Sequence, residues 1–131
     1  MVVAGYLGSL GRMSPAPELF EYIGFFEAEP EVLHPEVGWW YGAKFRSTRG
    51  ADRMVAVIAP DEGEFSFTWW RDDKLFADLR MRGVLKWHLE CNSTKETLSL
   101  GFEQPGLKYF LLQLKPHISI AWHTEWSHHA A

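Results

Sequence analysis

The stretch EFSFTWWRDDKLFADLRMRGVLKWHLEC, residues 64–91, decides the fold class. Apolar residues occupy alternate positions in its first part, 64–71, which is the period of a β-strand. Polar residues at 72–74 and the Arg82-Gly83 pair then separate two further alternating runs. Turns this short predict an antiparallel meander, because parallel strands need a crossover connection of about a dozen residues or more.

The same pattern continues on both sides of this stretch. Turn-forming sequences such as Pro60-Asp61-Glu62-Gly63 and Asn92-Ser93-Thr94-Lys95 bound the neighbouring apolar runs. We therefore expect an all-β, or β-rich α+β, fold: an antiparallel meander of about seven to eight strands that forms a barrel or a sandwich. The expected strands cover 39–45, 54–59, 64–71, 75–81, 84–91, 98–102, 107–115 and 117–126.

The sequence before the first expected strand predicts one short helix and an extension. The segment 17–26 follows the helix-start signal Pro15-Ala16-Pro17-Glu18, and its apolar residues are spaced by three or four, which favours a helix over a strand. Residues 1–12 are apolar but lack a basic start, so we expect a loosely ordered extension rather than a signal peptide, followed by a single β domain over 13–131. No run approaches the roughly 20 apolar residues of a membrane-spanning helix.

Alternation also predicts which side chains form the core. The runs 75–81 and 84–91 each direct every second residue inward, and the second is expected to bury Cys91 as an unreactive thiol. The residues expected to face inward in these two runs are Leu75, Ala77, Leu79, Met81, Leu85, Trp87, Leu89 and Cys91. The residues expected in the core are Trp87, Leu89, Leu100, Phe102, Ile120 and Trp122.

Composition narrows the functional classes. The 131 residues carry 13 Lys and Arg against 17 Asp and Glu, a net charge of −4, so no general basic field is present to hold nucleic acid phosphates. The single cysteine excludes an internal disulfide, and we expect a cytoplasmic location. The seven Trp and nine Phe are large enough to supply a core, and some of the Trp residues are alternatively part of a binding surface.

Negative charge is concentrated in one segment. Residues 13–43 contain six Glu and no Lys or Arg, whereas 44–131 is nearly balanced. This acidic segment is either a solvated face or a docking surface for a basic protein partner. In the second interpretation, the partner-binding residues are Glu27, Glu29, Glu31, Glu36, Trp39 and Trp40.

No sequence motif indicates catalysis, and we expect a protein that is not an enzyme and that uses no cofactor or metal. A phosphate-binding glycine loop, a nucleophile elbow and a His-Glu helix motif are all missing from the sequence. His117 and His123 share a strand face in the predicted fold, but a separation of about 20 Å prevents them from binding one ion. Asp72 and Asp73 fall in an expected turn, where solvated carboxylates need no chemical role.

One local pattern resembles a known family. The sequence Gly38-Trp39-Trp40-Tyr41 is similar to the Gly-x-Trp-Tyr that opens the first strand of lipocalin-type barrels. The resemblance implies that Trp40 closes one end of a ligand cavity, and that the chain carries a small apolar ligand as lipocalins and fatty-acid-binding proteins do.

The chain as a whole resembles a second group. A small, acidic, Trp-rich β protein with one cysteine and no catalytic motif resembles the immunity proteins that bacteria make against their own toxins. This resemblance implies a cytoplasmic protein that binds and neutralises a toxin. A basic toxin would be attracted by the acidic segment, and we prefer this function to that of a lipocalin-like carrier.

Overall fold

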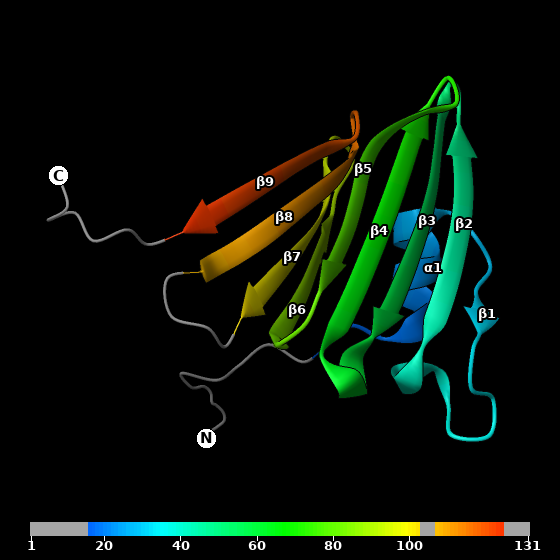
Figure 1. Cartoon of the computed structure of the whole chain (residues 1–131), viewed down its shortest axis with the longest axis vertical. Helices are drawn as coiled ribbons and strands as arrows, with labels where there is room; N and C mark the ends of the chain where they lie inside the picture. Colours follow the sequence, from blue (N-terminus) through cyan, green and yellow to red (C-terminus); the bar gives the residue numbers. More distant parts are fainter. Residues whose placement is uncertain (1–15, 103–106, 125–131) are drawn as a thin grey trace, which may run out of the picture.

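The computed structural model describes residues 16–102 and 107–124, and the expected extension 1–12 lies outside them (Figure 1). In this part of the chain, nine antiparallel strands form two sheets beside one short α-helix. In chain order the elements are α1 (Leu19–Phe26), β1 (Glu31–Val32), the 3₁₀ turn η1 (Trp39–Tyr41), β2 (Ala43–Arg49), β3 (Asp52–Ala59), the 3₁₀ turn η2 (Pro60–Glu62), β4 (Glu64–Arg71), β5 (Lys74–Met81), β6 (Val84–Cys91), β7 (Glu96–Phe102), β8 (Leu107–Lys115) and β9 (Ser119–Thr124).

The strands follow one another as the predicted meander, but the meander is split. Strands β1 to β5 form one sheet and β6 to β9 the other, each in sequence order. At the break, Met81 and Val84 are both buried, and the Val84 amide donates a hydrogen bond to the carbonyl of Gly63, 3.0 Å away. The described strands do not form a closed barrel, so the structure removes that alternative.

The inner faces of the two sheets meet through aromatic side chains. Phe65 of β4 lies 6.1 Å from Phe110 and 6.4 Å from Trp87, measured between ring centroids. Phe65 and Phe110 are fully buried, as is Leu100 of β7, the strand between β6 and β8. These contacts confirm Trp87 and Leu100 as core residues. Leu89, Phe102 and Ile120 are partly buried against the same core.

The helix α1 covers another part of the first sheet, as Figure 1 shows behind β2 and β3. It begins with a capping box: the Glu21 carboxylate accepts the Glu18 amide at 2.8 Å, and the Glu18 side chain accepts the Glu21 amide. Phe26 stacks on Phe45 of β2 with a centroid distance of 4.8 Å. The helix predicted over 17–26 is confirmed, and its buried residues show that it completes the core.

Several inward-facing predictions are wrong because bulges change the alternation. The pairing of β6 with β7 shifts between Val84 and Lys86, so Val84 is buried and Leu85 is 61% exposed. A shift at Trp69 and Trp70 pairs Leu75 with Trp70, and Leu75 is exposed as well.

Other errors occur at strand ends and sheet edges. Cys91 is exposed because it is the last residue of β6, an edge strand. Trp122 is 46% exposed on the edge strand β9, although one side of its ring contacts Phe110. The first predicted strand, 39–45, begins only at Ala43, because 39–41 form a 3₁₀ turn. The last predicted strand, 117–126, is observed over 119–124, and its Trp126 lies outside the described residues.

Candidate protein-interaction surface

The connection between β1 and β2 is a tightly closed loop. Its two ends are joined where the Leu33 amide donates to the carbonyl of Gly42 at 2.9 Å. A Cβ atom at Gly42 would lie 3.1 Å from the Leu33 side chain, and its φ of 152° is in the region that L side chains rarely adopt. Within the loop, the His34 carbonyl accepts the amides of Val37 and Gly38. These bonds fix the position of the aromatic turn η1 that follows.

The turn η1 presents large apolar side chains to solvent. Trp39 is partly buried and packs on Tyr22 of α1, with a centroid distance of 5.9 Å. Trp40 stacks on Trp39 at 5.1 Å and is 45% exposed. Tyr41 and Val37 are also exposed. Because the core anchors Trp39, the exposed rings are pre-positioned for contact with a partner, and aromatic residues of this kind often dominate binding energy.

Exposed acidic residues lie on the two segments next to this turn. The turn η2 lies against η1 at the lower end of the first sheet in Figure 1, and both of its acidic residues, Asp61 and Glu62, are exposed. Glu36, on the loop before η1, is exposed too. Within the described ranges, none of these three carboxylates forms an ion pair. We call the surface formed by Glu36, Val37, Trp40, Tyr41, Asp61 and Glu62 the acid–aromatic end.

Glu27 has a structural position instead. It ends α1 in the left-handed conformation, with φ of 55°, and its carboxylate lies 2.9 Å from Lys115 and 3.3 Å from Arg49. The hydrogen bond from Lys115 and the charge of Arg49 lower the pKa of Glu27 below its usual value. Its charge is therefore used within the molecule, where it ties the helix end to β2 and β8.

The two remaining predicted acids lie between the helix and the loop. Glu31 of β1 pairs with Arg46 at 3.0 Å, and both side chains are more than half exposed. Glu29 is exposed and has no ion pair with any described residue. The predicted set is thus divided: Glu36 and Trp40 belong to the acid–aromatic end and Trp39 anchors it to the core, whereas Glu27 and Glu31 are engaged in ion pairs.

Sequence reasoning missed Asp61 and Glu62 because they follow the acidic segment by two strands. The sequence pattern predicts only a hairpin turn at these two residues. The pairing of Ala43 with Ile58 across β2 and β3 brings η2 against η1, although the two turns are far apart in the sequence. Knowledge of which residues of β2 and β3 pair would have been needed to predict that the two turns lie together.

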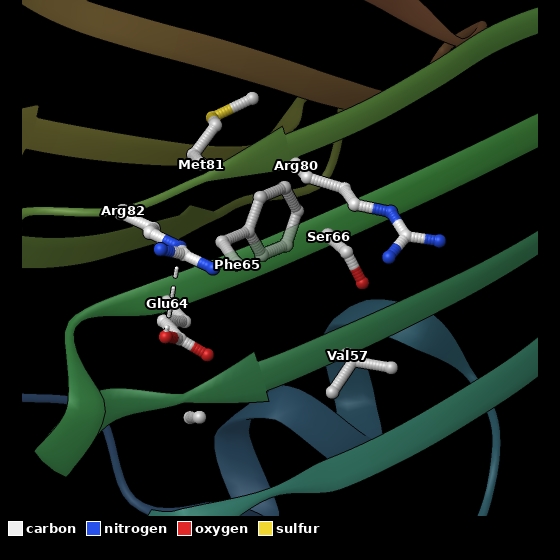
Figure 2. A pocket seen from close by; sticks show the side chains of 8 residues that line it. Val57, Glu64, Phe65, Ser66, Arg80, Met81 and Arg82 are labelled. Carbon is white, nitrogen blue, oxygen red and sulfur yellow. Dashed lines mark ion pairs between the residues drawn. The ribbon is translucent and has the colours of Figure 1, made fainter.

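A shallow hollow lies beside η2 on the outer face of the first sheet (Figure 2). Its volume is about 210 Å³, and Glu64, Ser66, Arg80 and Arg82 supply its polar groups. Arg82 lies 4.0 Å from the Glu64 carboxylate, and both side chains are at least half exposed. The hollow presents these donors and acceptors on the outer face of the first sheet.

Neither a metal-binding cluster nor a membrane-spanning helix is present among the described residues. No group of three or more His, Cys, Asp or Glu is arranged to hold a metal ion among residues 16–102 and 107–124. His123 lies on β9, whereas His117 precedes that strand. None of the described helices has the length and apolar character needed to cross a membrane.

The lipocalin-like interpretation of Gly38-Trp39-Trp40-Tyr41 is not supported by the local structure. These residues precede β2 and do not open a strand. Trp40, which the resemblance assigned to the end of a cavity, is exposed and stacks on Trp39 from outside.

Comparison with known proteins gives a likeness in fold. No protein-family model and no curated protein sequence matches the chain. One solved structure that is similar is a chain of a contact-dependent growth inhibition toxin–immunity protein complex from Klebsiella pneumoniae 342. The TM-score is 0.67 at 14% sequence identity, and the match covers 84% of this chain and 96% of that chain. The predicted resemblance to proteins of toxin–immunity systems is therefore confirmed at the level of the fold.

Proposed function

We propose that this chain is an immunity protein, which binds a cognate bacterial toxin in the cytoplasm and neutralises it by covering its surface. The observation that carries this proposal is the likeness of most of the fold to a chain of a toxin–immunity complex. The chain acts by binding, without catalysis. Cys91 is the single cysteine of the chain and is exposed, so it cannot form an internal disulfide. A free thiol of this kind fits a reducing compartment such as the cytoplasm.

The charge and motifs of the chain favour the immunity partner over the toxin. The sequence is acidic and contains none of the common catalytic motifs. The acid–aromatic end combines three exposed carboxylates, which have no ion pair among the described residues, with the exposed rings of Trp40 and Tyr41. Carboxylates attract a basic surface and accelerate its association, and the rings supply apolar contact after docking. We therefore propose a toxin domain with a basic face as the partner.

The carrier function has less support. A carrier needs an apolar cavity inside the fold. Between the two sheets, Phe65 contacts both Trp87 and Phe110, and all three side chains are buried. A rigid, filled scaffold with an exposed contact surface is what an inhibitor requires.

The test is co-expression with the protein encoded by the neighbouring gene, since a toxin and its inhibitor are expected to be encoded together. Cells that produce that toxin domain alone should stop growing, and cells that also produce this chain should grow. The purified proteins should form a stable complex. A neighbouring gene without toxic activity, or a toxin that the folded chain neither binds nor inhibits, would contradict the proposal.

The surface is tested in the same assay with matched variants. The combined change Glu36→Lys, Asp61→Lys and Glu62→Lys should weaken complex formation and protection. Glu90→Lys, an exposed charge reversal on β6 of the other sheet, should preserve both. Equal loss per reversed charge in the two variants would assign the effect to net charge rather than to the acid–aromatic end.

A further inference from the structure

A groove lies between α1 and the edge strand β6. Its volume is about 420 Å³, within the range of small-ligand sites, and it shares no residue with the acid–aromatic end. The helix supplies one wall, and the ends of β6 and β7 supply the other. The lining residues are Phe20, Glu21, Gly24, Phe25, Leu89, Cys91 and Glu96.

The apolar part of the groove is open to solvent. Phe20 is 71% exposed, whereas Tyr22, Phe25 and Phe26 of the same helix are buried. No heavy atom lies within 4 Å of a Cβ placed on Gly24. Glycine is among the least favourable residues inside a helix, and at this position no close contact requires it. Its structural effect is to leave the groove unfilled.

Two carboxylates give the groove a negative charge. Glu21 forms no ion pair with a described residue, and α1 contains no Lys or Arg. Oε2 of Glu96 lies 3.5 Å from Lys115, whereas its Oε1 is buried with no hydrogen-bond partner among the described residues. Burial, then the charges of Glu96 and Glu21, raise the pKa of the Cys91 thiol, consistent with a negative potential in the groove.

We propose that this groove receives an arginine or lysine side chain of a protein partner. The aliphatic stem of such a side chain would pack on Phe20 and Leu89, and its cationic end would lie near Glu21 and Glu96. An exposed apolar wall beside two carboxylates matches a side chain that is apolar along its length and positive at its tip. The groove and the proposed immunity function both require a protein partner, but binding to the groove is tested below without any toxin. A negative result for the groove would therefore leave the immunity function untouched, and the reverse also holds.

The test is an NMR titration with butylguanidinium, a mimic of the arginine side chain, at low ionic strength. We expect saturable shifts of the backbone amides of residues 20–25, 89–91 and 96, with a Kd on the order of 10 mM for a ligand of this size. Butylurea, which has the same shape without the charge, should bind several-fold more weakly. Equal shifts with both compounds, or shifts only outside these residues, would overturn the proposal.

Three variants locate the site. Gly24→Leu should fill the groove and abolish the saturable shifts, while Gly24→Ala, which adds one methyl group in the same open space, should retain them. Glu21→Gln keeps the capping acceptor and should weaken binding by roughly three-fold, the effect of one partly exposed charge. The amide spectrum of each variant reports whether it is folded. Unchanged binding in folded Gly24→Leu and Glu21→Gln would refute the assignment.

Discussion

The carboxylate of Glu27 lies 2.9 Å from the ammonium group of Lys115 and joins the C-terminal end of α1 to β8. A third charged group, the Arg49 guanidinium, lies 3.3 Å from the same carboxylate and also donates to the Phe25 carbonyl at 3.1 Å. The helix end is thus held to both sheets by a small charged network. This network explains why Glu27 has a structural role, although the sequence places it in an acidic segment.

The first prediction concerns this network and pH. The pKa of Glu27 is lowered in the folded state, so its contribution to stability is present above the unfolded value of about 4.5 and is lost as the pH falls through the lower folded value. Glu27→Gln should reduce the free energy of unfolding at neutral pH by roughly 0.5–1 kcal/mol, because the side chain is 48% exposed and solvent screens the pair. Urea unfolding at several pH values measures this, and the difference between wild type and variant should shrink below pH 4.

Charge reversal at the same position gives the matched control. Glu27→Lys places a third cation beside Arg49 and Lys115 and should destabilise the fold more than Glu27→Gln. Glu29→Lys, which breaks no ion pair with a described residue, should change the free energy of unfolding by no more than about 0.5 kcal/mol. Equal melting temperatures for the two reversals would show that the network adds nothing to stability.

The second prediction concerns the aromatic core. Trp87 is 8% exposed and packs edge-on against Phe65 between the sheets. Trp87→Ala should cost roughly 3–5 kcal/mol, because it creates a cavity that the rigid sheets cannot close. Trp122→Ala, on the edge strand, should cost clearly less. Chemical denaturation of both variants measures the difference, and a loss under about 1 kcal/mol for Trp87→Ala would exclude it from the core.

The sequence predicted the meander well because the signal was local. Most of the expected strands show their own two-residue period, and turn residues mark their ends, whereas the two-residue strand β1 (Glu31–Val32) shows no period and was not predicted. The prediction of buried residues was wrong where strand pairing interrupts this period: the register shift between Val84 and Lys86 turns Leu85 outward. A bulge depends on how two strands fit together, and one strand's alternation does not reveal it.

The candidate surface was predicted only in part for a similar reason. Glu36, Trp39 and Trp40 are close in sequence, and the acidic bias of that segment was visible. Asp61 and Glu62 join them through strand pairing, and Glu27 leaves the set because its cationic partners come from β2 and β8. Both differences between the predicted set and the acid–aromatic end depend on contacts between distant residues, which composition and spacing do not encode.

The third prediction concerns a polar cluster at the opposite end of β3. Asp52 accepts a hydrogen bond from the Trp69 indole at 2.9 Å and pairs with Arg71, also at 2.9 Å. The Arg71 hydrogen bond, then that from Trp69, lowers the pKa of Asp52. Asp52→Ala should cost about 1–3 kcal/mol, because it leaves a partly buried indole N–H without its acceptor. Asp52→Asn should cost less, since an amide oxygen still accepts from Trp69. Thermal unfolding compares the two, and identical losses would show that the carboxylate charge, not the hydrogen bond, is the important feature.

The last prediction separates the two components of the acid–aromatic end by kinetics. If the partner is a basic toxin domain, the charges should act on encounter and the rings on the docked complex. The change Glu36→Lys, Asp61→Lys and Glu62→Lys should slow association by about ten-fold or more at low salt and flatten its dependence on ionic strength. Trp40→Ala should leave the association rate nearly unchanged and accelerate dissociation by roughly ten-fold or more, as loss of an exposed anchor does. Surface plasmon resonance at three salt concentrations measures both rates, with Glu90→Lys as the control reversal. A charge variant that alters only dissociation, or a Trp40→Ala variant that alters neither rate, would place the contact surface elsewhere on the molecule.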